Sequence, residues 1–310
     1  MAFSDLVKHT AADAGITQLG YFTKGISQFA HDFTPQTAQR YAGVAVPVYS
    51  LSASDFDAST NNWCDGDDVG GLVVTLDYHS IAGISLPDTG VSLSGNYAGC
   101  AYGEQDMTVN QIVRDATVGI VKAIEEQIAT NIYGKFLTSN VAVSAKTAPA
   151  VSADATAWAE AIGDAVTAGA ITDPTKAVML VTPELFYGFY AAAAKDHVVF
   201  PEQEALKYGM IENVFGLKAV VMAKSLGGGA VKAALVQEDA FGIVSRANRP
   251  AINGYWDTFE IRTEDGFQIG FRAFEHLCQG ALKFAGDALY GAKFLQLDAN
   301  GKAKGIQLYT

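Results

Sequence analysis

Residues Thr108 to Phe136, TVNQIVRDATVGIVKAIEEQIATNIYGKF, form the longest uninterrupted helical pattern in the chain. Side chains four positions apart share one side of a helix, so a four-residue apolar repeat predicts a helix with one continuous apolar side. At about 1.5 Å per residue this helix is on the order of 40 Å long, which exceeds the width of a small domain. The pattern therefore predicts a helix that braces an extended subunit. The repeat consists of Ile112, Ala116, Ile120, Ile124, Ile128, Ile132 and Phe136.

Both ends of the predicted helix carry recognisable signals. Thr108 with Gln111 three residues later is typical of a capping box, and Gly134 stands where a left-handed residue ends a helix. Glu125 and Glu126 are expected on the polar side of the helix with Lys122, where solvation or pairing along the helix accounts for them.

Before the helix the pattern is extended. Val44, Val46 and Val48 alternate with other residues, and a second alternating run covers 72–76. The connection is the polar stretch SASDFDASTNNWCDGDDVGG, so the sequence predicts a long projecting hairpin. Pro47 inside the first run indicates an edge strand. Because an isolated two-stranded ribbon is only marginally stable in water, this hairpin is expected to need a partner surface.

Residues 1–42 carry scattered aromatic side chains without a sustained period. We interpret this segment as an arm that lies across a neighbouring surface, since a single domain would leave those aromatics exposed. The alternative is an arm that folds back on its own chain.

After the helix, short strands alternate with helices. The sequence predicts helices over Ala153–Ala168 and from Pro183 to about Ala194, with strands at Ala177–Val181 and Phe215–Met222. Such interleaving is typical of a compact mixed subdomain.

The last third of the chain is mostly extended. Leu235–Arg246 forms one run, and Tyr255–Thr263 and Phe267–Phe274 are predicted to form a hairpin about Asp265-Gly266. In that hairpin Phe267, Ile269 and Phe271 face one side, while Gln268 and Arg272 face the other. Phe294–Leu297 and Gly305–Leu308 are expected to make a final pair around Asn300-Gly301. These late strands are expected to pack on the long helix, so the chain leaves one subdomain and returns to it.

No catalytic template was found in the sequence. It contains no G-x-S-x-G, P-loop or H-E-x-x-H motif. Asp65, Asp67 and Asp68 could hold a hard cation, but the glycine spacing does not fit a calcium loop, and a solvated loop is expected instead. A soluble metal-dependent enzyme that uses these carboxylates is kept as a distant alternative.

Composition argues against further classes of protein, namely proteins that bind nucleic acid tightly, secreted proteins and membrane proteins. The chain has 310 residues with 33 acidic against 21 basic side chains and a net charge of −12, so tight binding to a phosphate backbone is disfavoured. The first twenty residues contain no apolar signal region, and no segment is long and apolar enough to span a membrane. The expected protein is soluble and made in the cytosol, without a cofactor.

The order of these elements resembles the major capsid protein of tailed bacteriophages, the Hong Kong ninety-seven fold. VMLVTPELFYGFY looks like the strand-then-helix step of the family's axial domain, and IENVFGLKAVVMAKSL resembles a passage in which a glycine after an apolar strand precedes a paired strand. ALVQEDAFGIVSR and EIRTEDGFQIGFRAFEHLCQGALKFAGDALYGAKFL are similar to the closing strands of its peripheral domain, including the Leu289-Tyr290-Gly291 segment. The resemblance extends over nearly the whole chain, and it lies in the order of the helices, strands and loops.

The resemblance implies an α+β fold divided along the chain. The implied parts are an N-arm over 1–42, an E-loop hairpin over 43–76, a peripheral domain with the spine helix over 77–139, an axial domain over 140–240, and peripheral strands with the C-terminus over 241–310.

The resemblance also implies a function and partners. Copies would assemble through pentamers and hexamers into an icosahedral shell around phage double-stranded DNA, in the host cytoplasm, with a portal protein and in some relatives a decoration protein. Some members cross-link an E-loop lysine to a neighbour, but no lysine occurs between Lys24 and Lys122, so a non-covalent shell is expected. A long N-terminal scaffolding extension is lacking, which favours a separate scaffolding protein.

The nearest alternative is an encapsulin-type shell that encloses cargo enzymes. In either shell, the aromatic residues of the arm and hairpin are expected to make the contacts between subunits. They are Phe3, Tyr21, Phe22, Phe29, Phe33, Tyr49, Phe56 and Trp63.

Overall fold

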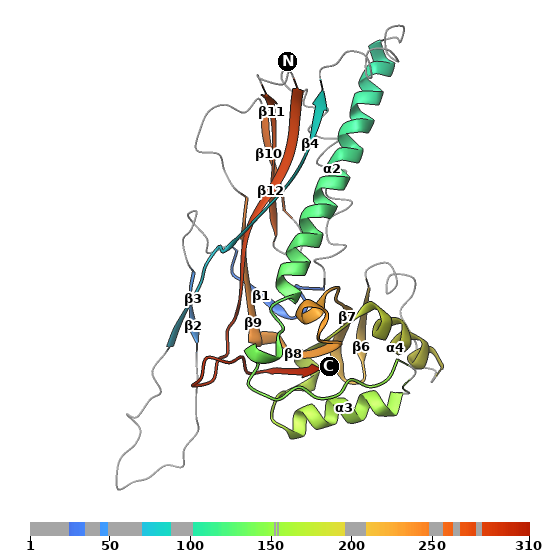
Figure 1. The fold of residues 1–310 in the computed structure, drawn as a ribbon, viewed down its shortest axis with the longest axis vertical. Helices are drawn as coiled ribbons and strands as arrows, with labels where there is room; N and C mark the ends of the chain where they lie inside the picture. Colours follow the sequence, from blue (N-terminus) through green and yellow to red (C-terminus); the bar gives the residue numbers. More distant parts are fainter. Residues whose placement is uncertain are drawn as a thin grey trace.

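A computed structural model of the chain describes ten parts of it. They are residues 25–34, 44–48, 70–87, 102–151, 153, 155–195, 209–247, 257–262, 267–276 and 281–310. Within these parts the fold mixes three sheets with a few helices, and one long helix runs beside the largest sheet (Figure 1). None of the helices in these parts combines the length and apolar character that a membrane crossing needs.

The long helix predicted from the sequence is α2, Tyr102–Tyr133. It begins six residues before Thr108, so Thr108 and Gln111 lie inside the helix and the predicted capping box is wrong. The end was predicted closely, although Gly134 is not left-handed. Its N–H donates to the Thr130 carbonyl oxygen at 2.9 Å and so continues the helical hydrogen bonding.

The apolar stripe of α2 faces the protein interior along its described length. Ile120, Ile124, Ile128 and Ile132 are at most 3% exposed. The prediction for Glu125 is wrong, because this side chain is fully buried, whereas Glu126 is exposed and pairs with Lys224. Glu125 lies one helical turn from Val121 and Ala129, which are both buried, so the buried side of α2 is wider than the isoleucine stripe alone.

The largest sheet has six strands. Five follow the order β1-β9-β12-β11-β10, and β4 pairs with the free side of β12. The strands are β1 (Ala30–Asp32), β4 (Tyr78–Pro87), β9 (Phe241–Arg246), β10 (Asp257–Arg262), β11 (Gln268–His276) and β12 (Ala281–Phe294).

The predicted hairpin of the last third is confirmed as β10 and β11, which pair antiparallel from Asp257 with Ala273 to Arg262 with Gln268. Its predicted faces are confirmed too, since Phe267, Ile269 and Phe271 are fully buried. The ten-residue strand β4 and the fourteen-residue strand β12 were not predicted as strands of this length.

The helix α2 packs on one face of this sheet at Gly286 of β12. A Cβ on Gly286 would lie 2.6 Å from Ile120 Cγ2 and 3.3 Å from Ile124 Cδ1. The missing side chain thus lets the helix approach the strand backbone. Since side chains alternate between the faces of a strand, Asp287 and Leu289 belong to the opposite face, which we call the outer face.

The second sheet has five strands in the order β13-β8-β5-β7-β6. They are β5 (Ala177–Val181), β6 (Met210–Val214), β7 (Leu217–Met222), β8 (Ala233–Gln237) and β13 (Ile306–Tyr309). The helices α3 (Ala155–Thr167) and α4 (Pro183–Lys195) cover one face, with Trp158, Phe186 and Phe189 buried against it. The opposite face joins the core formed by the end of α2 and the six-stranded sheet. The predicted strand at Ala177–Val181 and the helix that begins at Pro183 are therefore confirmed.

The predicted final strand pair is wrong. Phe294 ends β12 in the first sheet, whereas β13 pairs with β8 in the second, and only an isolated bridge joins Leu297 to Ala303. The turn itself was predicted correctly, because the Asp298 carboxylate accepts from the N–H of Asn300 at 2.8 Å and of Lys302 at 2.7 Å. Likewise, the run Leu235–Arg246 divides into β8 and β9, which belong to different sheets.

Alkaline pH should destabilise the fold through Tyr309. Burial raises the pKa of this side chain to about 12, with a smaller contribution from the negative charge of Asp164, and its hydroxyl donates to the Ala161 carbonyl at 2.8 Å. The unfolded chain loses this proton near pH 10, so the contribution to stability is complete below pH 10 and is lost as pH rises towards 12. Urea unfolding of Tyr309→Phe should therefore show a weaker loss of stability from pH 10 to 12 than the unsubstituted chain. Tyr187→Phe, at an exposed position, is the matched control and should leave the pH dependence unchanged.

Candidate assembly surfaces

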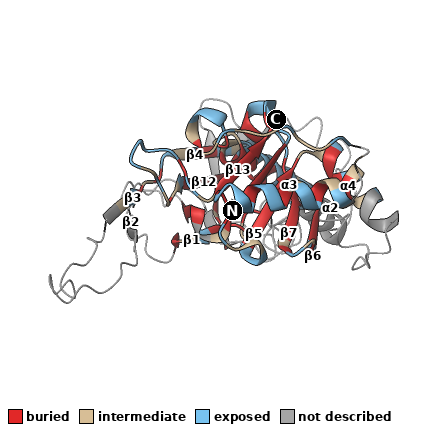
Figure 2. Ribbon diagram, turned by 90° about the horizontal axis from the view of Figure 1, so that it is seen from below, coloured by how far each residue is buried: buried red, intermediate tan, exposed pale blue. Residues whose placement is uncertain are grey.

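A two-stranded ribbon stands apart from both larger sheets. β2 (Val44–Val48) and β3 (Gly70–Val74) pair antiparallel, from Val44 with Val74 to Val48 with Gly70. Among the described strands each has only the other as a partner, and Figure 2 shows the ribbon to one side of the buried interior. The predicted strands of the hairpin are confirmed, with the second strand two residues earlier than expected, and Pro47 lies on an edge strand as predicted.

The ribbon is attached to the body by one small apolar cluster. The cluster joins the end of β3 to β9 and to the residues that follow β12, and it consists of Phe33, Val74, Leu76, Val244 and Leu295, with Leu72 partly buried beside it. The Lys293 ammonium also donates to the Val73 carbonyl oxygen at 3.2 Å. The ribbon is thus fixed at one end, and the end that joins residues 49–69 is remote from this attachment.

Gly291 of β12 allows the ribbon base to approach the outer face of the six-stranded sheet. A Cβ at this position would overlap the carbonyl oxygen of Thr75, one residue after β3. The backbone of Thr75 cannot yield as a flexible side chain would, so only glycine fits here without a shift of the ribbon base.

Gly291→Ala should destabilise the chain by about 1–3 kcal/mol in urea unfolding, because the new methyl group forces the ribbon base away from β12. Gly119→Ala is the matched control. Gly119 is an exposed residue of α2 with no atom within 4 Å of an added Cβ, so alanine there should stabilise the chain by about 0.5–1 kcal/mol. Equal effects of the two substitutions would contradict the role assigned to Gly291.

The described end of the N-terminal segment packs in the subunit's own core. β1 pairs parallel with β9, and Phe29 is fully buried with its ring centroid 5.6 Å from that of Phe241 and 5.9 Å from that of Phe136. Phe33 is 8% exposed in the cluster at the ribbon base. Phe29 and Phe33 therefore pack as expected for the alternative, in which the segment folds back on its own chain. Because both side chains are buried in their own subunit, they are not available for contacts with a neighbouring subunit.

The other predicted site residues lie outside the described parts of the chain. They are the six aromatic contact residues Phe3, Tyr21, Phe22, Tyr49, Phe56 and Trp63, and the three candidate metal carboxylates Asp65, Asp67 and Asp68. Within the described parts, no group of three or more His, Cys, Asp or Glu side chains could hold a metal ion.

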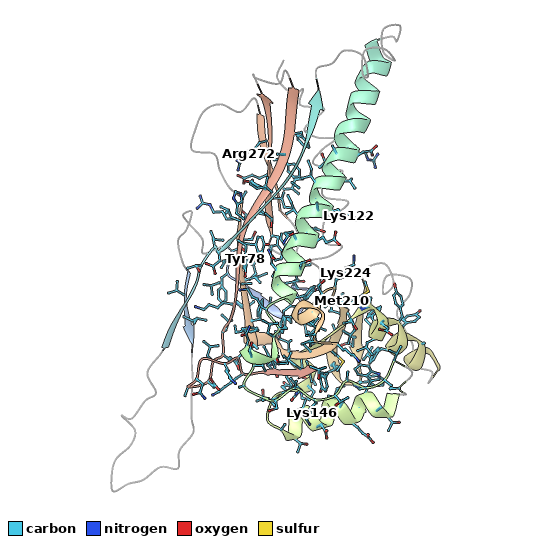
Figure 3. The ribbon with its side chains drawn as sticks, viewed as in Figure 1. Tyr78, Lys122, Lys146, Met210, Lys224 and Arg272 are labelled. Atoms are coloured by element: carbon cyan, nitrogen blue, oxygen red, sulfur yellow. The ribbon has the colours of Figure 1, made fainter. Side chains whose placement is uncertain are left out.

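A polar cluster on the outer face was not predicted from the sequence. The buried Asp287 carboxylate accepts from the Arg272 guanidinium at 2.6 Å and lies 3.0 Å from His79 Nε2. These residues come from three adjacent strands, β12, β11 and β4. Arg272 lies on the side of the sheet away from α2 (Figure 3). The outward position of Arg272 was predictable from strand alternation, but nothing in the sequence paired it with Asp287.

On the opposite face, polar groups join the sheet to α2. The Tyr290 hydroxyl lies 3.1 Å from Ser80 Oγ and accepts from the Asn131 amide at 2.5 Å. Burial raises the pKa of Tyr290, and the two hydrogen bonds oppose part of that shift. These contacts tie β4 and β12 to α2 and fix the position of the helix along the sheet.

Two large apolar side chains remain exposed near these surfaces. Ile81 of β4 is 66% exposed and Val73 of β3 is 47% exposed. Isolated exposed apolar residues are common on protein surfaces. Ile81, however, lies on the outer face beside the buried Asp287 cluster, and Val73 lies on the ribbon, whose described strands pair only with each other.

Comparison with known proteins found similarity at the level of solved structures. No family model matches the chain, and no curated protein matches its sequence. A structure from Mycobacterium phage Che8 matches with 14% identity over 88% of this chain and 85% of the other, at a TM-score of 0.45. The capsid of a native GTA particle matches with 13% identity over 93% and 89%, at 0.48, and the capsid of Ralstonia phage GP4 with 11% identity over 91% and 86%, at 0.49. Two of these three structures are named as capsids, and the third is named after a mycobacteriophage.

Proposed function

We propose that this protein is a major capsid protein, which assembles through pentamers and hexamers into an icosahedral shell around phage double-stranded DNA. The ribbon of β2 and β3 is the observation that carries the proposal. Its strands have no other partner among the described strands, and a two-stranded ribbon of this length is only marginally stable alone. A neighbouring copy of the chain would supply the missing surface.

The long helix and the charge of the chain support the same proposal. A helix of 32 residues beside a six-stranded sheet makes a subunit that is long in one direction, as a thin shell requires. The net charge of −12 suits a container, because a shell that bound its genome tightly at many sites would hinder packing and release. The role is structural, and no catalytic step is assigned to the chain.

In this proposal the parts of the chain keep the roles that the sequence resemblance implied. Residues 1–42 are the N-arm, 43–76 the E-loop, 77–139 the peripheral domain with the spine helix, 140–240 the axial domain, and 241–310 the closing peripheral strands. Assembly takes place in the host cytoplasm with a separate scaffolding protein and a portal protein, and with a decoration protein where one is encoded. Many weak contacts between copies, each of a few kcal/mol, would act together in the closed shell.

Electron microscopy of the expressed chain, together with any scaffolding protein encoded beside it, tests the proposal. Closed shells of uniform diameter are the expected result, with DNA inside particles isolated from infected cells. Shells that hold an enzyme instead would favour an encapsulin-type container. A chain that stays a compact monomer under all these conditions, with residues 43–76 protected from protease, would rule out a shell protein.

A further inference from the structure

The turn between β12 and β13 contains a residue pair that favours a spontaneous chemical reaction. In an Asn-Gly pair the backbone nitrogen of the glycine can attack the side-chain carbonyl of the asparagine, because glycine has no side chain to block the approach. Asn300-Gly301 is such a pair. In the described parts of the chain, every other asparagine precedes isoleucine, valine or glutamine.

The reaction converts the asparagine amide to an acid. A bond forms between Gly301 N and Asn300 Cγ, the bond between Cγ and Nδ2 breaks, and ammonia leaves with the proton that Gly301 N has lost. The product is a succinimide ring. Water then opens the ring at either carbonyl group, which gives aspartate or isoaspartate, so water is the only co-reactant.

The turn leaves space for the ring. Asn300 and Gly301 are both exposed. Gly301 has a φ of +74°, and no atom of the described parts lies within 4 Å of a Cβ added to it. Neither a side chain nor a packed neighbour therefore obstructs the attack on Asn300.

The folded turn nevertheless restrains the attacking nitrogen. The Gly301 N–H donates to the Asp298 carbonyl oxygen at 3.0 Å. The Asp298 carboxylate accepts from the N–H of Asn300 at 2.8 Å and from the N–H of Lys302 at 2.7 Å, which closes the turn. Because Gly301 N must lose its hydrogen bond before it attacks, the reaction proceeds from molecules in which the turn has opened locally. The open fraction sets the rate.

The charge of Asp298 makes the product less favourable than the starting turn. Hydrogen bonds hold the pKa of Asp298 below its usual value, first that from the Lys302 N–H and then those from the backbone and side chain of Asn300. The Asn300 side chain thus lies beside a carboxylate. An aspartate at position 300 would place a second negative charge at the same place, and like charges at short range repel.

The turn also positions the segment 302–304, which leads from the six-stranded sheet to the five-stranded sheet. Ala303 is fully buried, and its N–H donates to the Asn140 carbonyl oxygen at 2.8 Å. The Lys304 N–H donates to the Gln296 carbonyl oxygen at 2.9 Å. Isoaspartate adds an extra backbone atom to the turn, so the segment loses its register with these two partners. A change at position 300 therefore reaches the junction of the two sheets.

We propose that Asn300 is a site of deamidation, and that the hydrogen bonds of Asp298 set the rate of this reaction in the folded chain. Asp298 acts as a protecting residue that keeps the turn closed over Gly301 N. The inference does not depend on the proposed shell function, and its test uses the unassembled chain.

Asp298→Ala tests the protecting role in the full chain. Purified protein is incubated at mildly alkaline pH, and mass spectrometry of its proteolytic peptides measures conversion at Asn300. Conversion should be at least about threefold faster in Asp298→Ala, because two hydrogen bonds to a charged acceptor are lost. Asp164→Ala is the matched control, since Asp164 is an exposed carboxylate of α3 that pairs with Lys146, and it should leave the rate at Asn300 unchanged.

The Asn253-Gly254 pair provides a reference in the same digest. It is the other Asn-Gly pair of the sequence and lies outside the described parts of the chain. Its conversion should be equal in the unsubstituted chain and in Asp298→Ala. An equal acceleration at both pairs would show that Asp298→Ala acts by unfolding the whole chain, and would contradict local protection by the turn.

A synthetic peptide of residues 296–304 gives a comparison that does not depend on the folding of any variant. Asn300 should convert faster in the peptide than in the unsubstituted chain, with both aspartate and isoaspartate among the products. Equal rates in the peptide and the folded chain would overturn the protecting role of the turn. If Asn300 of Asp298→Ala stayed unconverted while the peptide reacted completely, Asn300 would not be a deamidation site of the folded protein.

Discussion

Ile124→Asp should leave the chain unfolded at 25 °C. Ile124 is 1% exposed in the middle of α2, where it lies against Gly286 of β12. An aspartate at this position loses the apolar contacts of the isoleucine and buries a carboxylate, which costs several kcal/mol even after relaxation. The expected loss is more than about 5 kcal/mol, which equals or exceeds the total stability of many domains.

The neighbouring residue provides the control for this prediction. Ala123→Asp introduces the same side chain one position earlier, where the helix surface is exposed, and should cost less than about 1 kcal/mol. Far-ultraviolet circular dichroism and urea unfolding compare the two variants. If Ile124→Asp gave a folded monomer that only failed to assemble, α2 would be an interface helix and not the brace of the subunit core.

The success of the sequence in predicting α2 has a physical reason. A helix of 32 residues repeats its contact with the sheet many times, so the four-residue period survives the substitution of any one position. The hairpin of β10 and β11 was predictable for a similar reason, because the alternation of Phe267, Ile269 and Phe271 coincides with the Asp265-Gly266 turn signal.

Strands β4 and β12 could not be predicted because their small residues are required by close contacts with residues that are distant in the sequence. Gly286 lies under Ile120, Gly291 lies under Thr75, and a Cβ on Gly83 would be 2.9 Å from the Cβ of Ala285 across the pair. Glycine and alanine disfavour strands by intrinsic preference, and only the packing of the finished fold reverses that preference. The segments therefore lack the bulky alternation by which a strand is recognised.

For the candidate assembly surfaces, the sequence predicted which residue types are present but not how they are arranged in space. The aromatic and acidic content of the hairpin segment was evident in the sequence, and so was the absence of a catalytic motif. His79 is 208 positions from Asp287 in the sequence and Arg272 is 15 positions from it. Strand register brings the three together, and no local pattern encodes that register. Phe29 illustrates the reverse problem, because an aromatic residue in an aperiodic segment gives no sign of the core into which it packs.

Asp287→Ala should destabilise the folded chain by about 3–5 kcal/mol. The Asp287 side chain is 5% exposed and that of Arg272 is 16% exposed, so removal of the carboxylate leaves a guanidinium that water reaches poorly. Asp164→Ala is the control, because Asp164 pairs with Lys146 at 3.1 Å but is 67% exposed, and this pair should contribute less than about 1 kcal/mol. Urea unfolding at pH 7 measures both variants.

A double substitution tests whether Asp287→Ala destabilises the chain because the Arg272 guanidinium loses its carboxylate partner or because packing around β12 is lost. Arg272→Met combined with Asp287→Leu replaces the buried ion pair by apolar side chains, and such replacements are often neutral or stabilising. The double variant should therefore recover most of the stability that Asp287→Ala loses, with His79 still able to reach water at 33% side-chain exposure. If the double variant were as unstable as Asp287→Ala, the loss would come from the packing around β12, and the ion pair would not be what holds β4, β11 and β12 in register.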